Sequence, residues 1–436
     1  MTTPSLRATR PAAPAPPVAR RRHWLRAGWL MTASGWSANQ FSALLGAYRT
    51  DLGLTDAATT GLFAVYVLGL IPGLLLAGPA AGRHGRRPVT FAALAVSALA
   101  TCLLMAGPAA AWLLWPGRFL TGLGAGTLLT AGSVWIKELS AAPYGTAPTP
   151  GAAARRSGLF LSAGFASGGL AAACIAEWAP HPMVLAYVPH LALTAAAALS
   201  ASGTPETGLT HHPAAPAPAG KPTRAAGSVP ATAPAPAADP VLTTESTPAP
   251  PSPTAFRRLV APLAPWVFAA PTLAFATLPG LVDAHLDGWR TVYAGLATAV
   301  TPGTGLLVAP LARSLAARHR MATAYCGLAA IAAGLLLGAL AVARTDPALA
   351  LLAAALLGGG YGLAVAYGLT EVAALTPPHR SAHRTARFWA LCYLGFCAPY
   401  AVTLLTGVWS PATVLTGAAA LALLTLAALA RNAART

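Results

Sequence analysis

Charged residues are scarce in this chain of 436 residues, since Asp, Glu, Lys and Arg together make up 9% of it. Soluble domains carry about 25% charged residues. Hydrophobic residues reach 56%, so a soluble chain would have too little polar surface to cover its apolar side chains. The scarcity of charge excludes an ordinary soluble domain and predicts an integral membrane protein.

Several kinds of chemical site are absent. The pattern Gly-x-x-x-x-Gly-Lys-Ser/Thr, which cradles nucleotide phosphates, does not occur, so direct ATP hydrolysis is not expected. Neither a nucleophile elbow nor a paired His-Glu metal helix is present. The five cysteines lie in apolar runs without metal-ligand spacing. We therefore expect a protein that is not an enzyme and has no metal or cofactor.

Acidic residues are also few, 11 against 28 basic residues, which gives a net charge of +17. Such a charge suits nucleic acid, but the arginines are dispersed between apolar runs and do not gather on one face. Nucleic acid is therefore not an expected partner. Every acidic residue falls in a loop, in a tail or near the end of an apolar run.

What the chain has is long apolar runs, each near the roughly 20 residues that a helix needs to cross a bilayer. Residues 204–256 interrupt the series with 13 prolines among Ser, Thr and Ala, a composition that favours a flexible linker. The predicted spans are 27–48, 57–81, 88–110, 112–137, 157–177, 183–203, 258–282, 289–312, 321–343, 348–371, 385–407 and 411–431.

These runs predict an all-α membrane protein of twelve transmembrane helices. The expected parts are a cytoplasmic tail (1–26), a six-helix bundle (27–203), a cytoplasmic linker (204–256), a second six-helix bundle (257–431) and a short tail (432–436). With both termini inside, the cytoplasmic segments hold 24 of the 28 basic residues, the arrangement that the positive-inside rule favours. We expect a multi-pass, monomeric protein of the plasma membrane.

A short arginine-bearing loop lies between the second and third spans. It reads Gly78-Pro79-Ala80-Ala81-Gly82-Arg83-His84-Gly85-Arg86-Arg87. It resembles the loop Gly-x-x-x-Asp-Arg-x-Gly-Arg-Arg of the major facilitator superfamily (MFS), with Gly82 in place of the acid. The halves also repeat at an offset of about 230 residues, as in Pro72/Pro302, Arg156/Arg387 and Glu138/Glu371. Parallel repeats of this kind relate the two halves of such transporters.

The resemblance implies two pseudo-symmetric six-helix bundles that rock about a central site, and a cytoplasmic gate near the arginine loop. Because Gly82 replaces the acid, Glu138 and Glu371, at the ends of the fourth and tenth spans, are candidate substitutes that pair with loop arginines. The predicted gate residues are Gly78, Arg83, Gly85, Arg86, Arg87, Glu138, Arg318 and Glu371.

Arg118 lies about five residues inside the fourth span, in a run with glycines at 122, 124 and 126. A charge at that depth costs roughly 2.5–3.5 kcal/mol unless it faces a polar interior. The resemblance implies a role in proton coupling, and the alternative is an arginine that reaches the outer headgroups. Glycines at this spacing allow a neighbouring helix to pack closely.

Asn39 and Gln40 lie in the first span near the depth of Arg118, where they can bind substrate or make a structural interhelical bond. His190 is the histidine placed deep in a span, either as a proton carrier or as a packing residue. The substrate and coupling candidates are Trp36, Asn39, Gln40, Tyr66, Arg118, Trp135, His190 and Tyr361.

A cavity so poor in fixed charge suits a neutral or amphiphilic small molecule. We predict a secondary transporter of the drug-efflux-like branch, driven by protons. One alternative is uptake or facilitated diffusion of a neutral solute without proton coupling, which the lack of a mid-membrane acid favours. The other is a sensor or scaffold that does not transport. The expected partners are a small-molecule substrate, the lipid bilayer and protons.

Overall fold

The computed structural model describes residues 22–145, 152–207, 253–375 and 381–435. Throughout these ranges the chain forms helices joined by turns, with no strand. The first part holds α1 (His23–Asn39), η1 (Gln40–Leu44), α2 (Leu45–Thr50), α3 (Asp56–His84), α4 (Arg86–Met105), η2 (Ala111–Leu113), α5 (Leu114–Thr127), η3 (Leu128–Gly132), α6 (Ser133–Ser140), α7 (Ala152–Trp178), α8 (Pro182–Leu185) and α9 (Val188–Ser202).

The second part begins at Pro253, so α10 overlaps the end of the predicted linker (204–256), of which 208–252 lie outside the described residues. It holds α10 (Pro253–Leu259), α11 (Trp266–Thr272), η4 (Leu273–Thr277), α12 (Leu278–Val282), η5 (Asp283–His285), α13 (Arg290–Leu307), α14 (Ala309–Arg318), α15 (Ala322–Arg344), α16 (Pro347–Ala374), α17 (Ser381–Tyr393), η7 (Leu394–Cys397), α18 (Ala398–Leu405) and α19 (Pro411–Ala433).

Eleven helical runs in the described chain are long and apolar enough to cross a membrane. The remaining predicted span is the first, where α1 has only 17 residues. There the chain continues directly through the 3-10 turn η1 into α2, so the whole segment from His23 to Thr50 is helical. With this interrupted span the fold has the twelve transmembrane helices that the sequence predicts.

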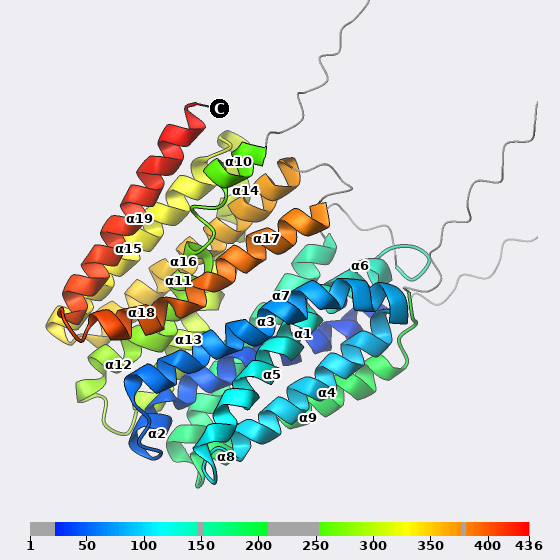
Figure 1. Cartoon of the computed structure of the whole chain (residues 1–436), viewed down its shortest axis with the longest axis horizontal. Helices are drawn as coiled ribbons and strands as arrows, with labels where there is room; N and C mark the ends of the chain where they lie inside the picture. Colours follow the sequence, from blue (N-terminus) through cyan, green and yellow to red (C-terminus); the bar gives the residue numbers. More distant parts are fainter. Residues whose placement is uncertain (1–21, 146–151, 208–252, 376–380, 436) are drawn as a thin grey trace, which may run out of the picture.

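The helices form two bundles that lie side by side (Figure 1). In the first, α3 packs on α5, α5 on α4, and α4 on α9. The second repeats these neighbours with α13 on α16, α16 on α15, and α15 on α19. The internal repeat in the sequence is thus a repeat in packing.

Glycines allow the closest helix contacts. A β-carbon on Gly122 of α5 would lie 2.0 Å from the carbonyl oxygen of Tyr66 on α3, as the glycine spacing of that run predicts. Between the bundles, α7 packs on α13 and α3 packs on α18. In the first of these interfaces a β-carbon on Gly169 would lie 2.2 Å from the Thr298 methyl group, so the Thr298 side chain packs directly on the backbone of α7.

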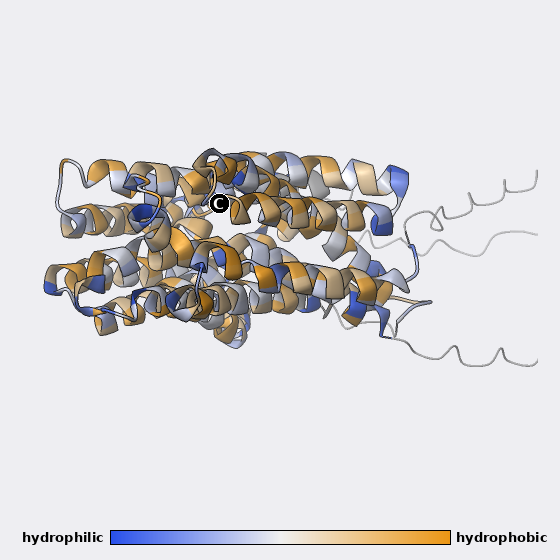
Figure 2. Cartoon of the chain, turned by 90° about the horizontal axis from the view of Figure 1, so that it is seen from below, coloured by the Kyte–Doolittle hydropathy of each residue, from blue (hydrophilic) through white to orange (hydrophobic). Residues whose placement is uncertain are grey.

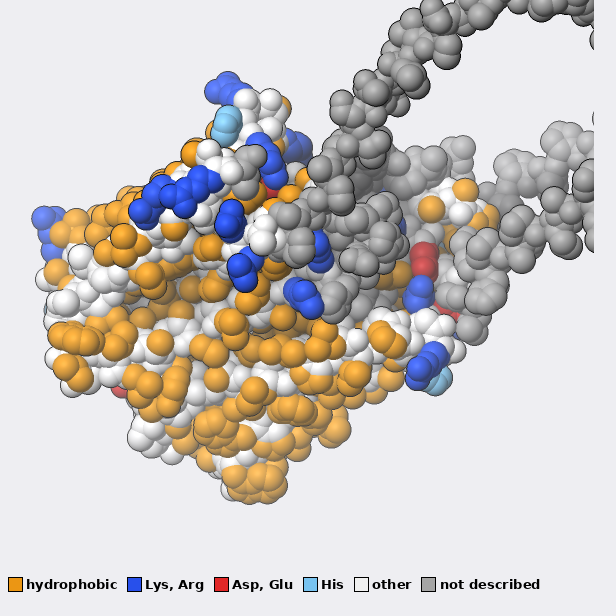
Figure 3. Space-filling view, turned by 45° about the horizontal axis from the view of Figure 1, so that its top comes forward, with side chains coloured by type: hydrophobic (Ala, Val, Ile, Leu, Met, Phe, Trp, Pro, Cys, Tyr) orange, Lys and Arg blue, Asp and Glu red, His pale blue; other side chains and the backbone are white. Residues whose placement is uncertain are grey.

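The polar residues gather at the two ends of the molecule, while its flanks are hydrophobic (Figures 2 and 3). We call the end that holds Arg22, Gly85 and Ala433 the terminal end, and the opposite end the far end. The described arginines concentrate at the terminal end, where Figure 3 shows Lys and Arg side chains beside the grey segments. The far end carries mostly acids: Asp51, Asp56, Glu177, Asp283, Asp287 and Asp346, with Arg49, Arg290 and Arg344.

Candidate functional site

The first span breaks where its two amide side chains lie. The α-helix ends at Asn39, and the 3-10 turn begins at Gln40. Asn39 donates a hydrogen bond from Nδ2 to the carbonyl oxygen of Phe165 on α7, at 3.0 Å. Gln40 is fully buried and points instead into the first bundle, where its Nε2 lies 3.5 Å from Thr101 Oγ1 on α4. Asn39 therefore contacts α7 and Gln40 contacts α4, although the two residues are consecutive.

A small cavity lies between the bundles beside this break. Its volume is about 30 Å³, little more than one water molecule occupies. Most of its wall is aromatic, and none of its lining residues carries a charge. The lining residues are Ala38, Asn39, Phe165, Phe268, Pro271, Phe275, Pro302, Tyr361 and Phe396.

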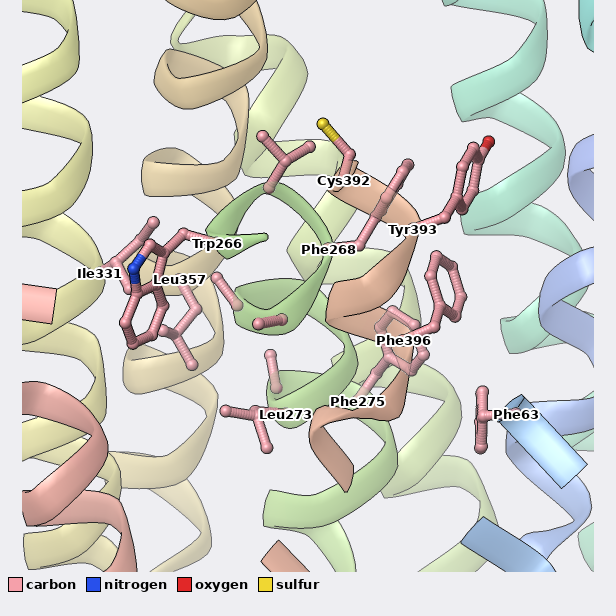
Figure 4. Close-up of a cluster of buried hydrophobic side chains, with 14 of the residues drawn as sticks. Phe63, Trp266, Phe268, Leu273, Phe275, Ile331, Leu357, Cys392, Tyr393 and Phe396 are labelled. Carbon is pink, nitrogen blue, oxygen red and sulfur yellow. The ribbon is translucent and has the colours of Figure 1, made fainter. Parts of the chain in front are cut away.

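The aromatic wall continues into the second bundle. Phe268 of α11 stacks on Tyr393 of α17 with ring centres 4.5 Å apart, and lies 4.9 Å from the ring of Phe396 (Figure 4). Across the bundles, the Phe396 ring lies 5.5 Å from that of Tyr66 on α3. These rings bury a large apolar area, and they can stack on a flat aromatic ligand.

A wider opening lies at the far end. It has a volume of about 570 Å³ and is bounded by both bundles: η1, α2 and the end of α7 on one side, and η4, α12 and the start of α13 on the other. Phe275 lines both this opening and the central cavity. The far-end vestibule is large enough for a small organic molecule, whereas the centre is nearly closed.

Arg118 lies inside the first bundle. It is 0% exposed, and its guanidinium carbon lies 4.3 Å from the ring centre of Phe41 and 4.7 Å from that of Tyr66. Its Nε donates to the Leu62 carbonyl at 3.4 Å, but Nη1 and Nη2 have no hydrogen-bond partner. The arginine therefore does not reach the headgroups, and aromatic rings surround its charge.

Two other polar pairs share this part of the first bundle. The hydroxyls of Tyr48 and Tyr187 lie 2.5 Å apart, and both side chains are fully buried. His190 is also 0% exposed and lies 2.8 Å from Thr101 Oγ1 through Nδ1. Sequence reasoning singled out His190 but not the tyrosines, because nothing in an apolar run marks which phenols face each other.

The predicted substrate and coupling residues do not form one cluster. Asn39 and Tyr361 line the central cavity, from opposite bundles. Tyr66 lies between Arg118 and Phe396, whereas Trp36 packs against α7 at Gly168. Gln40, Arg118 and His190 are buried inside the first bundle.

Trp135 corrects the prediction most clearly. It was expected in the cavity, but it is 0% exposed and donates from Nε1 to the carbonyl of Pro205, 3.1 Å away. This contact lies at the terminal end, because α6 and the chain after α9 both end there. Trp135 is a packing residue of the first bundle and does not line the cavity.

At the terminal end, each bundle has its own Arg–Glu pair. Arg86 Nη2 lies 3.1 Å from Glu138 Oε1, and Arg320 pairs with Glu371 in the second bundle. Hydrogen bonding to Glu371 raises the pKa of Arg320 above its usual value. The predicted gate residue was Arg318, which is the last residue of α14 and is exposed. The arginine that pairs with Glu371 is Arg320, in the turn before α15. Both pairs are internal to one bundle, so neither joins the bundles in this conformation.

The arginine loop has an acceptor that sequence reasoning missed. Glu206 accepts hydrogen bonds from the backbone N–H groups of Arg86 and Arg87, at 2.7 and 2.8 Å. It thereby caps the start of α4. Gly85 makes the contact possible, because its φ is +94° and a β-carbon there would lie 2.7 Å from the Glu206 carboxylate. The sequence pattern does not mark this contact, because Glu206 and Arg86 lie 120 residues apart.

The remaining predicted gate residues of the arginine loop are Gly78, Arg83 and Arg87. Gly78 is exposed within α3, and Arg83 is exposed at the end of that helix. The Arg87 guanidinium lies 5.7 Å from the ring centre of Phe91. None of these three contacts the second bundle in a hydrogen bond or ion pair between described residues.

Comparison with known proteins supports this architecture. Among curated proteins, a 77-residue segment is 36% identical to the multidrug resistance protein MdtL of Klebsiella pneumoniae (strain 342). That segment covers 18% of this chain and 19% of MdtL, so the match spans only a small part of that relative.

Solved structures match over nearly the whole length. A POT family transporter in complex with a thioalcohol-conjugated peptide has a TM-score of 0.72 at 12% identity, and covers 95% of this chain and 96% of its own. The nucleoside transporter NupG has a TM-score of 0.67 at 11% identity, covering 94% and 99%. The D-xylose–proton symporter has a TM-score of 0.58 at 16% identity, covering 94% and 96%. At these identities the likeness shows the fold.

The family model described as the Major Facilitator Superfamily matches residues 27–399. This range ends within the eleventh span, and it contains the arginine loop, the break in the first span and the buried arginine. The chain therefore belongs to the Major Facilitator Superfamily of membrane transporters.

Proposed function

We propose that this transporter exports a neutral or amphiphilic small molecule in exchange for protons. The observation that carries the proposal is the uncharged, aromatic wall of the cavity between the bundles, with Asn39 and Tyr361 as its polar residues. Such a wall binds flat apolar ligands and offers no counter-charge to a strongly charged metabolite.

Two features support alternating access. The far-end vestibule is open to about 570 Å³, whereas the central cavity has room for little more than one water. A cargo molecule would thus be bound only after the Phe275 side chain and its neighbours move apart. The tight interface between α7 and α13 gives the bundles a surface on which to rock.

Two observations favour a direction of transport and a location. MdtL is by its name a multidrug resistance protein, which favours export here. The arginines at the terminal end suit the cytoplasmic side of the plasma membrane, where short loops carry the positive excess. We propose that both termini are cytoplasmic, that the six-helix units are residues 27–203 and 257–431, and that the protein works as a monomer.

A second candidate is uptake or facilitated diffusion of a neutral solute without proton coupling. The observation that favours it is that the lining of the central cavity contains no carboxylate. The two candidates differ in their response to a pH gradient, which drives accumulation only in the coupled case.

The test uses everted membrane vesicles and two fluorescent probes, the cation ethidium and the neutral dye Nile red. We expect the wild-type protein to accumulate at least one dye only when a pH gradient is imposed, and Arg118→Ala to lose that accumulation. Transport that ignores the gradient would favour the facilitator. If neither dye moves in either condition, the proposed cargo class is wrong.

A further inference from the structure

Proton coupling, if the proposed function holds, needs a group that takes up and releases a proton. Arg118 does not meet this need, because the guanidinium stays protonated in proteins. The described acids that belong to helices all lie close to helix ends; they are Asp56, Glu138, Glu177, Asp283 and Glu371. Within the described spans, the deeply buried group whose chemistry fits is the imidazole of His190.

The hydrogen bonds around His190 run in one direction. Thr194 Oγ1 donates to the backbone carbonyl of His190 at 2.7 Å, so it can only accept from the ring nitrogen Nε2, 3.3 Å away. This contact assigns the hydrogen of the neutral ring to Nε2. The Ala33 carbonyl on α1 is a further acceptor next to the ring.

Nδ1 is therefore the free basic nitrogen. It accepts from the Thr101 hydroxyl at 2.8 Å, and that hydroxyl oxygen in turn accepts from Gln40 Nε2 at 3.5 Å. The chain of donors thus runs from Gln40 through Thr101 to His190. Each member comes from a different span: η1 in the first, α4 in the third and α9 in the sixth.

The end of this chain holds an orphan acceptor. Gln40 Oε1 is buried and has no hydrogen-bond partner. A buried acceptor left unpaired is unfavourable, because it has given up its hydrogen bonds to water. If a proton binds at Nδ1, the ring donates to Thr101, whose hydroxyl must then find an acceptor. A half-turn of the Gln40 amide supplies Oε1 for that purpose, so the orphan atom is the partner for the protonated state.

We propose that His190 carries the coupled proton and that Gln40 transmits its charge state to the cargo cavity. The proton forms an N–H bond at Nδ1 from water on one side of the membrane. The same bond breaks when the site opens to the other side, so no further reactant is needed. The inference deepens the proposed function and rests on it for the transport assay only.

The link to the cavity is the break in the first span. Gln40 begins the 3-10 turn, and its neighbour Asn39 lines the central cavity and binds the Phe165 carbonyl on α7. A rotation of the Gln40 amide changes the packing of the 3-10 turn next to Asn39, and Asn39 lines the cargo site. Binding on one side of the turn and protonation on the other are thereby coupled.

No acid lies on the described helices that pack most closely on α9. The elements that pack on α9 with the most extensive contact are α1, α4 and α8. Their titratable residues are bases at the terminal end, together with one exposed cysteine. They are His23, Arg26, Arg86, Arg87 and Cys102. Tyr187, which precedes α9, is engaged with Tyr48.

The test compares His190→Gln with His84→Gln, a matched substitution at an exposed histidine in the terminal end of α3. In vesicles with ethidium or Nile red, we expect His190→Gln to lose the accumulation that a pH gradient drives. Exchange of dye across the membrane at equal pH should persist, because the cavity lining is intact. His84→Gln should retain both activities. Gradient-driven accumulation by His190→Gln at the wild-type level would overturn the proposal.

A second measurement needs no cargo. Nitrogen NMR of histidine-labelled protein, with the His190→Gln spectrum subtracted, reports which ring nitrogen carries the hydrogen. We expect the Nε2–H tautomer in the wild type and a changed Nδ1 signal in Thr101→Val. An Nδ1–H tautomer would overturn the proposed chain. If the wild type moves neither dye, the proposed function fails, and the tautomer decides the inference on its own.

Discussion

The Arg118 guanidinium carbon lies 4.3 Å from the centre of the Phe41 ring, in a part of the first bundle that no solvent reaches. No carboxylate forms an ion pair with it in the described structure. The positive charge is balanced only by aromatic faces and by one backbone carbonyl. Cation–π contacts of this kind supply about 0.5–2 kcal/mol each, less than the cost of burying the charge.

Arg118→Met should therefore separate stability from transport. Replacing a poorly compensated buried charge by an apolar side chain of similar length is often neutral or stabilising by about 1–4 kcal/mol. We expect the apparent unfolding temperature in detergent to stay level or rise, while gradient-driven dye accumulation is lost. Arg118→Lys is the control that keeps the charge. Full accumulation by Arg118→Met would remove Arg118 from the coupling site.

Two glycines of the arginine loop should respond in opposite ways to alanine. Gly85 has a φ of +94°, and a β-carbon would meet the Glu206 carboxylate, so Gly85→Ala should destabilise the protein by about 1–3 kcal/mol. Gly82 lies in α3 with no atom within 4 Å of the added carbon, and Gly82→Ala should stabilise it by up to about 1 kcal/mol. Thermal unfolding of the two variants checks both signs, and equal effects would contradict the capping role of Glu206.

The two Arg–Glu pairs should differ in strength, because the Glu371 side chain is 3% exposed and that of Glu138 is 27% exposed. Arg320→Ala leaves a buried carboxylate unpaired, which costs about 3–5 kcal/mol. The Arg86–Glu138 pair, whose side chains are 19% and 27% exposed, keeps contact with solvent, so its loss in Arg86→Ala should cost less, about 1 kcal/mol. Apparent unfolding temperatures at neutral pH measure the difference, and the account fails here if Arg86→Ala is the more destabilised variant.

The same pair predicts a pH dependence. Hydrogen bonding to Glu371 raises the pKa of Arg320, so the pair's contribution to stability is complete below the pKa of an unfolded arginine and thus throughout the neutral range. The deficit of Arg320→Ala relative to the wild type should therefore stay constant across the neutral range and shrink only in strongly alkaline solution, where Arg320 loses its proton. Unfolding scans at neutral and mildly alkaline pH check this. A deficit that disappears at mildly alkaline pH would contradict it.

Whether a feature could be predicted from the sequence depends on how far apart in the chain its residues lie. Spans, glycine contacts and the Arg86–Glu138 pair could be predicted, because apolar length, small-residue spacing and the repeat are readable locally. That Arg320 and not Arg318 pairs with Glu371 could not be predicted, because it depends on the residue at which α14 ends. The opposed directions of Asn39 and Gln40 arise from a 3-10 turn that the apolar pattern does not mark.

The cavity lining gives a matched pair of phenylalanines. Phe396→Ala and Phe388→Ala both empty a buried position, at about 3–5 kcal/mol each. Only Phe396 lines the central cavity. We expect a raised KM for ethidium or Nile red in Phe396→Ala and an unchanged KM in Phe388→Ala at equal protein levels. A similar KM for both variants would mean that the cargo binds elsewhere.

The most direct test of the account measures protons during dye movement. Purified protein is placed in liposomes that contain a pH-sensitive dye such as pyranine, and a gradient of ethidium or Nile red is imposed at equal pH. The account predicts that the internal pH changes as the dye crosses, with protons moving in the opposite direction, and that His190→Gln abolishes this change. Dye that crosses in the wild type with no change of internal pH would contradict proton coupling and leave a facilitator.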